Sequence, residues 1–224
     1  MNILIYLCIL IICLLSLYFF KLFLSNFGLI ITMITMNLIS LILSFKFVTL
    51  STINLNANTI CYITMFTSLY LLIETMKKEE VKKIINLNFF ITVFASIFLF
   101  LMSYHTESIT DSISINMKNV FITNYRILIT YPISTLLSNY LLVSLYKKIK
   151  SLYDLPFITT VTTYLVIGLV SNLTFYLGAY LNIFNIKTIL ESSLSTYMIG
   201  LIITVIYSLI LPKYKSKKVV KWYL

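Results

Sequence analysis

The stretch NLNFFITVFASIFLFLMSY, residues 86–104, decides the class of this protein. The stretch contains no charged side chain. Its length is close to the 20 or so apolar residues that a helix needs to cross hydrocarbon. The stretch also lacks the period-2 alternation of a membrane β-strand. Six further stretches share this apolar character: 2–24, 27–50, 57–76, 120–146, 155–184 and 189–211. The sequence therefore predicts an all-α integral membrane protein, a bundle of six to seven transmembrane helices in a lipid bilayer.

The composition of the whole chain agrees with this class. Of its 224 residues, 60% are hydrophobic and 11% are charged, and the mean hydropathy is +0.98. Soluble domains are nearer half apolar and a quarter charged, so a water-soluble globular protein is excluded. The net charge of +10 comes from basic residues that separate apolar runs. That arrangement is typical of membrane loops and not of a nucleic-acid-binding face.

Lysine distribution predicts the orientation of the chain. Lysines gather in 77–83, in 147–150 and in the tail 213–224, whereas the alternate loops carry few charges. The positive-inside rule places the lysine-rich segments in the cytoplasm. We therefore expect a multi-pass protein whose C-terminus and basic tail 213–224 are cytoplasmic.

The first 26 residues have two interpretations. They are predicted to form an extra N-terminal transmembrane helix ahead of a six-helix bundle over 27–212. The alternative is a cleaved signal peptide. No basic region precedes the apolar run and no A-x-A-like site follows it before Ser25. An uncleaved helix is therefore favoured.

No pattern in the sequence indicates catalysis, a metal or a cofactor. His105 is the only histidine, so a histidine-pair metal site cannot be built. The phosphate-binding pattern G-x-x-x-x-G-K-[ST] is absent, and no Ser-His-Asp arrangement occurs at membrane depth. We expect that the protein is not an enzyme and uses no cofactor.

Three charged residues near predicted membrane depth are candidates for a binding site. A charge in lipid costs at least about 2.5–3.5 kcal/mol on insertion scales unless it is paired or hydrated. Each candidate also has a structural explanation. Lys46 can reach the interface with its long side chain, Glu74 can pair with Lys78 one turn on, and Arg126 can anchor the outer end of its helix.

Uncharged polar residues at helix depth add to these candidates. Asn139 and Asn172 carry amide donors and acceptors that neither lipid nor their own helix is expected to satisfy. Tyr70 and Tyr197 could stack on a planar ligand, although packing is the commoner role in a chain with 17 tyrosines.

The order of these features resembles the queuosine precursor transporters, also called the vitamin uptake transporter family, over roughly residues 37–212. Residues 40–46 (SLILSFK) are similar to the family's S-N-I-L-A-S-K run. Residues 62–83 are similar to F-P-L-T-F-L-x-T-D-x-x-x-E-x-x-G-x-x-x-A-R-K, with Glu74 on the glutamate. Residues 126–150 are similar to R-x-x-x-x-S-x-x-A-Y-x-x-x-Q-x-x-D-V-x-x-F-x-x-L-K.

Shorter matches and several departures complete the comparison. The pairs at 162–163 and 196–197 match the family's S-T and T-Y, and Asn139 stands where the family has glutamine. Family aspartates fall on Tyr70, on Leu142 and near Val170, and a family lysine falls on Gly200. Carboxylates that would form charge-assisted bonds with a cationic base are therefore lost, apart from the glutamate.

The resemblance implies a bacterial inner-membrane carrier for 7-deazaguanine bases that has no ATPase of its own. The missing aspartates favour a changed solute, small, flat or vitamin-like and neutral. The substrate-binding residues would be Lys46, Tyr70, Glu74, Arg126, Asn139, Asn172 and Tyr197. Two alternatives remain: a substrate-binding subunit of an energy-coupled vitamin transporter, and a non-transporting assembly or regulatory protein. A homodimer is compatible with each.

Overall fold

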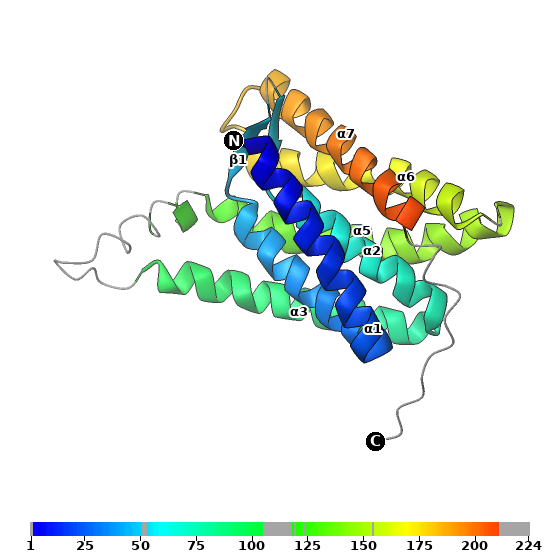
Figure 1. The fold of residues 1–224 in the computed structure, drawn as a ribbon. Helices are drawn as coiled ribbons and strands as arrows, with labels where there is room; N and C mark the ends of the chain where they lie inside the picture. Colours follow the sequence, from blue (N-terminus) through cyan, green and yellow to red (C-terminus); the bar gives the residue numbers. More distant parts are fainter. Residues whose placement is uncertain are drawn as a thin grey trace.

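The described residues form a helical bundle with a small β-hairpin (Figure 1). The computed structural model describes residues 2–50, 53–104, 118, 120–122, 124–153 and 155–210. Within them lie the elements α1 (Asn2–Leu43), β1 (Phe47–Leu50), β2 (Ile53–Asn56), α2 (Thr59–Thr75), α3 (Lys78–Met102), α5 (Tyr125–Leu152), α6 (Pro156–Tyr180) and α7 (Ile186–Ile210). All these helices except α2 are long and apolar enough to cross a membrane. The predicted helical class is confirmed.

Helix α1 is itself a hairpin of two helical segments. The backbone at Ser25 leaves the helical region, with φ 54° and ψ −128°. The Cys13 Sγ lies 3.9 Å from the Met36 Sδ, and the Asn2 side chain donates to the Thr49 carbonyl at 3.0 Å. These contacts join residues far apart in sequence, so the chain reverses at Ser25 as Figure 1 shows. The predicted break between 2–24 and 27–50 is therefore present.

A glycine permits the two segments to meet closely at this reversal. A Cβ atom on Gly28 would lie 1.9 Å from the Phe20 carbonyl oxygen, which is far inside contact distance. Any larger residue would force the two backbones apart. The close approach of the two backbones therefore requires glycine at position 28.

The second segment of α1 ends earlier than the sequence predicts. A continuous helix over 27–50 is wrong, because the helix ends at Leu43 and β1 pairs antiparallel with β2. The β-branched and aromatic side chains of β1 suit a strand as well as they suit a membrane helix. The Asn56 amide then donates to the Ser44 carbonyl at 2.8 Å, which fastens the end of the hairpin to the end of α1.

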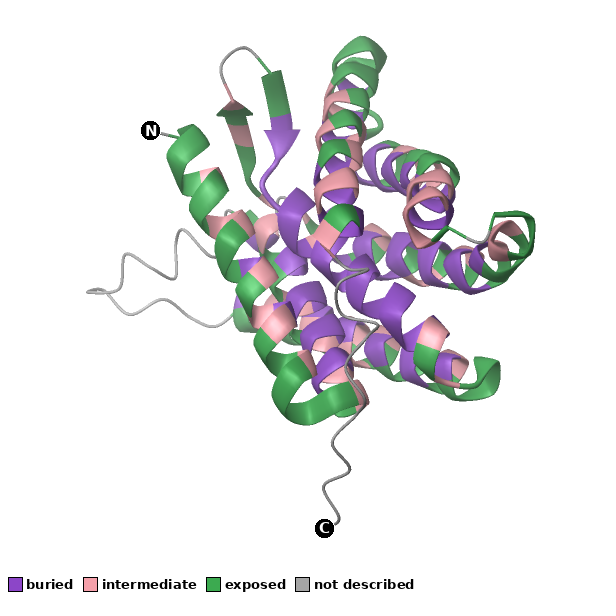
Figure 2. Cartoon of the chain, turned by 45° about the vertical axis from the view of Figure 1, so that its right-hand side comes forward, coloured by how far each residue is buried: buried purple, intermediate pink, exposed green. Residues whose placement is uncertain are grey.

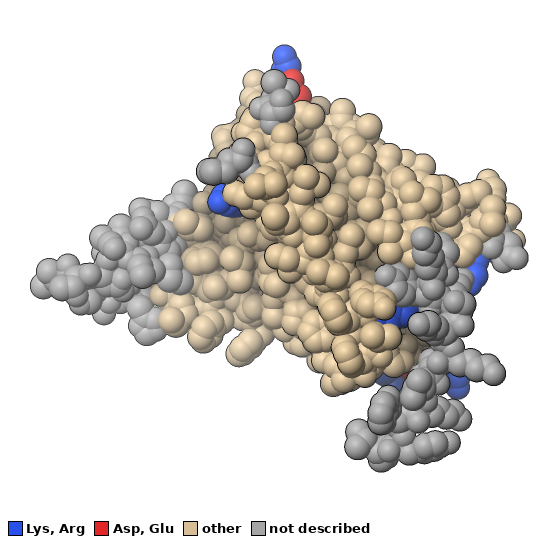
Figure 3. Space-filling model, in the orientation of Figure 1, with Lys and Arg blue, Asp and Glu red and all other residues tan. Residues whose placement is uncertain are grey.

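Charged residues gather at two opposite ends of the bundle. The lysine-rich end carries Lys77, Lys78, Lys82, Lys83, Lys147, Lys148 and Lys150. These lysines are mostly within α3 and α5 and not in loops as predicted, since α3 begins at Lys78 and α5 continues to Leu152. The hairpin end holds β1, β2 and the connection 181–185. On the face drawn in Figure 3, the described charged side chains lie at the ends and the broad band between them has none.

Helix α2 forms the centre of the bundle. Fourteen of its 17 residues are buried, so it contacts neighbours on nearly all sides. The first segment of α1 is peripheral, because Cys13 and Leu17 are its only buried residues among 2–24 (Figure 2). The predicted tail 213–224 and His105 lie outside the described residues.

Candidate functional site

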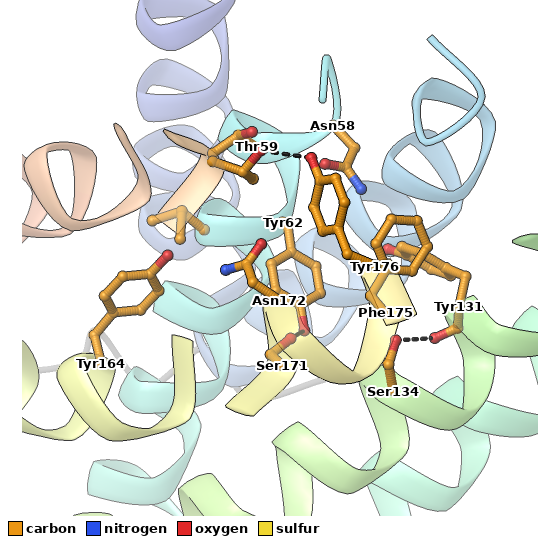
Figure 4. Close-up of a pocket in the computed structure, with 12 residues that line it drawn as sticks. Asn58, Thr59, Tyr62, Tyr131, Ser134, Tyr164, Ser171, Asn172, Phe175 and Tyr176 are labelled. Carbon is orange, nitrogen blue, oxygen red and sulfur yellow. Dashed lines mark hydrogen bonds between the residues drawn. The ribbon is translucent and has the colours of Figure 1, made fainter. Parts of the chain in front are cut away.

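A small polar cavity lies among α2, α5, α6 and α7, toward the hairpin end (Figure 4). Its volume is about 20 Å³ for the centre of a water-sized sphere, which is room for one water. Ten of the twelve residues that line it carry a hydroxyl, amide or phenol group, and none of these described side chains is charged. The polar residues on which the argument depends are Tyr62, Ser134, Ser171, Asn172, Tyr176 and Thr196. We call this space the inner cavity.

Hydrogen bonds between helices hold the wall of the inner cavity in place. The Tyr62 hydroxyl of α2 bonds the Ser171 hydroxyl of α6. The Tyr176 hydroxyl of α6 bonds the Thr196 hydroxyl of α7 at 2.6 Å. All four groups are neutral, and each can donate or accept after a rotation of its hydroxyl. The wall can therefore exchange these internal bonds for bonds to a solute.

The β-hairpin is hydrogen-bonded to the wall of the inner cavity. Asn56, the last residue of β2, is fully buried, and its backbone N–H donates to the Thr196 hydroxyl at 3.3 Å. Its side-chain oxygen accepts the backbone N–H of Asn58 at 3.0 Å. Asn56 thus links the hairpin and the start of α2 to Thr196, whose hydroxyl bonds Tyr176.

Asn172 is the predicted residue that the structure places in this wall. Its amide donates to the Gly168 carbonyl at 2.7 Å, so its own helix does satisfy one of its donors, contrary to expectation. Asn172 also borders a groove between α6 and α7 that Tyr197 lines. Tyr197 stacks on Tyr164, which is part of the inner wall, with ring centroids 6.0 Å apart. Asn172 therefore lies in the wall of the inner cavity, and Tyr197 lies next to that wall.

Tyr70 and Glu74 belong to a different cluster. Glu74 is 15 residues beyond Thr59 in α2, about 22 Å along the helix at 1.5 Å per residue. Its carboxylate contacts the Lys150 ammonium at 2.5 and 2.6 Å and accepts the Tyr146 hydroxyl at 2.8 Å. Tyr70 packs beside Tyr146, with ring centroids 5.2 Å apart. These residues join α2 to α5 near the lysine-rich end and do not line the inner cavity.

Lys46 and Arg126 lie at the hairpin end, outside the inner cavity. Lys46 is exposed in the turn before β1 and is not within a helix as predicted. Arg126 donates to the Leu181 carbonyl at 2.5 Å, where α6 has just ended. It satisfies a carbonyl that the helix leaves free, so its role in the structure is to tie the start of α5 to the end of α6.

Asn139 is buried but does not line the inner cavity. Its side chain is 1% exposed, and its Oδ1 atom has no hydrogen-bond partner. A buried acceptor without a partner costs about 1–3 kcal/mol. Asn139 therefore carries a cost that nothing in its surroundings offsets.

Sequence reasoning missed several residues of the wall. Tyr62, Ser134 and Tyr176 were not candidates, because a serine hydroxyl in an apolar helix usually bonds its own backbone and a tyrosine in a chain with 17 tyrosines usually has a packing role. A signal was present in α6 and α7, where Ser171-Asn172 and Ser195-Thr196 are adjacent polar pairs inside apolar runs. Such pairs in neighbouring helices are stronger indicators than single hydroxyls.

No family model, curated protein or solved structure matches this chain. Its function is therefore inferred from the cavity itself. Within the described residues, no three His, Cys, Asp or Glu side chains form a group that could hold a metal ion. The chemistry available at the site is neutral hydrogen bonding and aromatic contact.

Proposed function

We propose that this chain is a multi-pass membrane transporter that binds a small, flat, neutral solute at the inner cavity. One observation carries the proposal: neutral hydroxyl and amide groups converge with tyrosine rings on a buried site that no charged side chain lines. The resemblance to importers of 7-deazaguanine bases makes that class of solute the first candidate. The absent family aspartates favour a neutral relative of those bases.

The character of the wall supports a neutral solute. A charged solute would lose its hydration on entering and would meet no opposite charge, which is unfavourable in a buried site. Neutral hydrogen bonds contribute about 0.5–1.5 kcal/mol each, and aromatic rings add contact with a flat molecule. The closed cavity holds only one water, so part of the wall must move before a base-sized molecule can bind.

The distribution of charge supports import from the hairpin side. If the lysine-rich end is cytoplasmic, as the positive-inside rule requires, the inner cavity lies nearer the outer surface of a bacterial inner membrane. The Glu74–Lys150 pair then closes the cytoplasmic side. A solute would bind from outside and leave after this end opens.

A second candidate is a substrate-binding subunit that borrows a partner's ATPase. The inner cavity lies toward one end only, and about 22 Å of α2 separates Thr59 from Glu74. A site near one surface is what such a subunit needs. Co-purification with an ATPase would favour this candidate over a self-sufficient carrier.

An uptake assay tests the proposal. The chain is expressed in bacteria unable to make or import 7-deazaguanine bases, and queuosine is measured in their tRNA. We expect rescue that Tyr62→Phe reduces, because this change removes the bond to Ser171 and keeps the ring. Tyr140→Phe is the matched control. The Tyr140 hydroxyl of α5 donates to the Asn86 side chain of α3 at an exposed position, away from the inner cavity. Failure to rescue, with the protein present in the membrane and not stabilised by 7-deazaguanine, contradicts the proposed solute class.

A further inference from the structure

A second and larger cavity opens at the hairpin end, beside the inner cavity. Its volume, measured in the same way, is about 300 Å³, which a flat two-ring molecule can enter. Four of its eight lining residues are aromatic: Phe47 of β1, Tyr176 and Tyr180 of α6, and Phe184 after α6. We call these four residues the aromatic vestibule.

The rings of the aromatic vestibule form one connected cluster. The Phe47 centroid lies 5.4 Å from that of Tyr180, and Tyr180 lies 5.6 Å from both Tyr176 and Phe184. Phe47 and Phe184 are 37% and 47% exposed, so ring surface remains free for a ligand. Flat aromatic molecules gain contact with such rings.

Neutral polar groups complete the wall. Asn54 from β2 and Thr188 and Ser192 from α7 line the same space. They supply donors and acceptors without charge, as the inner cavity does. A few neutral polar groups among apolar and aromatic side chains are typical of a site for a small organic molecule.

Tyr176 is common to both cavities. It lines the inner cavity and the aromatic vestibule, and it is 1% exposed. Its hydroxyl is held by Thr196 at 2.6 Å, and Figure 4 shows its ring in the wall of the inner cavity. Tyr176 therefore borders both a space of about 300 Å³ and a space of about 20 Å³.

We propose that the aromatic vestibule is the outer binding site for a flat, neutral heteroaromatic solute, and that Tyr176 is the partition through which this solute reaches the inner cavity. The inference rests on the proposed function for the identity of the solute. Movement of the Tyr176 ring, with loss of its bond to Thr196, would join the two spaces.

The groove between α6 and α7 is the competing route. It borders the inner cavity at Asn172 and has a volume of about 180 Å³. Its wall is mainly leucine, including Leu169 and Leu194, which are 45% and 58% exposed. A solute with several hydrogen-bonding groups finds few partners there. The aromatic vestibule offers such groups and is therefore the favoured route.

Cysteine accessibility tests the partition. The background is a full-length chain in which Cys8, Cys13 and Cys61 are replaced. In it, Ser134→Cys places a thiol in the wall of the inner cavity. This position suits a reporter because the Ser134 hydroxyl donates only to the Tyr131 carbonyl of its own helix. The impermeant reagent MTSES is applied to right-side-out membrane vesicles. We expect slow labelling that Tyr176→Ala accelerates at least tenfold. Ser138→Cys, buried one turn further along α5, is the control and stays slow in both backgrounds.

Conservative variants protect this test against misfolding. Tyr176→Phe keeps the ring and removes the bond to Thr196, and Thr196→Val removes the same bond from the other side. Each is expected to accelerate labelling about threefold. Acceleration by Leu194→Ala without acceleration by any of these three variants would overturn the inference in favour of the groove between α6 and α7.

A fluorescent reporter tests the ligand class. Trp222 is the only tryptophan, so Trp222→Phe with Phe47→Trp places a single indole in the aromatic vestibule. We expect saturable quenching by 7-deazaguanine, weakened at least fivefold by Phe184→Ala, and no saturation with choline. Absence of quenching by 7-deazaguanine would overturn the vestibule as the solute site. Quenching and gated labelling without uptake in cells would leave this inference standing and refute transport.

Discussion

The carboxylate of Glu74 in α2 lies 2.5 Å from the ammonium of Lys150 in α5. The two side chains are 13% and 40% exposed, so the pair is neither fully buried nor free in water. It connects two helices at the lysine-rich end, far from the inner cavity. It therefore acts as a tie between α2 and α5 and does not line the inner cavity.

Loss of this ion pair should destabilise the bundle measurably. Lys150→Met leaves a mostly buried carboxylate with the Tyr146 hydroxyl as a remaining partner. The expected cost is about 1–2 kcal/mol, between the values for exposed and buried pairs. Denaturation in detergent measures it, with exposed Lys148→Met as the control on the same helix. Equal effects of the two variants would contradict the assignment.

A buried polar network should contribute more than the ion pair. The Tyr131 hydroxyl donates to the Asn37 side-chain oxygen at 2.8 Å, and the Asn37 amide donates to Thr92 and Asn88 at 2.6 and 3.1 Å. Asn37→Leu removes the centre of this network and leaves the Asn88 side-chain oxygen without its donor, whereas Tyr131 and Thr92 keep bonds to backbone carbonyls. We expect a loss of about 1–3 kcal/mol, the cost of one buried unsatisfied acceptor.

The control for the network is an exposed residue on the same helix. Thr35 bonds only carbonyls of its own helix, so Thr35→Val should change the unfolding free energy by no more than about 0.5 kcal/mol. Unfolding of both variants is followed by circular dichroism in detergent. A loss below 1 kcal/mol in Asn37→Leu would mean that the network is dispensable.

Gly28→Ala should open the reversal in α1. The added methyl group would lie 1.9 Å from the Phe20 carbonyl oxygen, and backbone cannot move aside as a flexible side chain can. Overpacking of this kind costs about 1–3 kcal/mol. Thermal unfolding compares this variant with Ser16→Ala in the first segment, which should be close to neutral. A fully stable Gly28→Ala would show that the two segments do not meet as described.

Asn139→Leu should stabilise the protein. The Asn139 Oδ1 is buried without a partner, and an apolar side chain of similar size removes that cost. The expected gain is about 1 kcal/mol. Asn172→Leu is the comparison, since the Asn172 amide does have a partner and its loss brings no such gain. If Asn139→Leu is destabilising instead, its oxygen has a partner that the structure does not record.

Much of the fold follows from the sequence, and the exceptions have physical causes. Apolar length sets the helices, and the polar pair Ser25-Asn26 marks the reversal of α1. Strand β1 was missed because its four residues continue an apolar run, and hydrophobicity alone does not separate a strand from a helix there. Pairing with β2 decides the matter, and that is a contact between segments.

The site was harder to predict than the helices. Position along the sequence gives the depth of a residue in its helix, and Asn172 was placed at the depth where the inner cavity lies. It does not give the direction in which a residue faces, nor which residues of other helices share its depth. Glu74 and Asn172 therefore seemed to belong to one site, although the structure assigns Glu74 to the opposite end. Packing among helices sets such relationships.

The small size of the inner cavity beside Tyr176 has a consequence for leakage. The inner cavity has room for one water, and the Tyr176 ring at its border is hydrogen-bonded to Thr196. A space of this size cannot contain the continuous file of water that an ion needs to cross a membrane. If the protein carries its solute as proposed, the membrane that contains it therefore keeps its ion gradients while the ring is in this position.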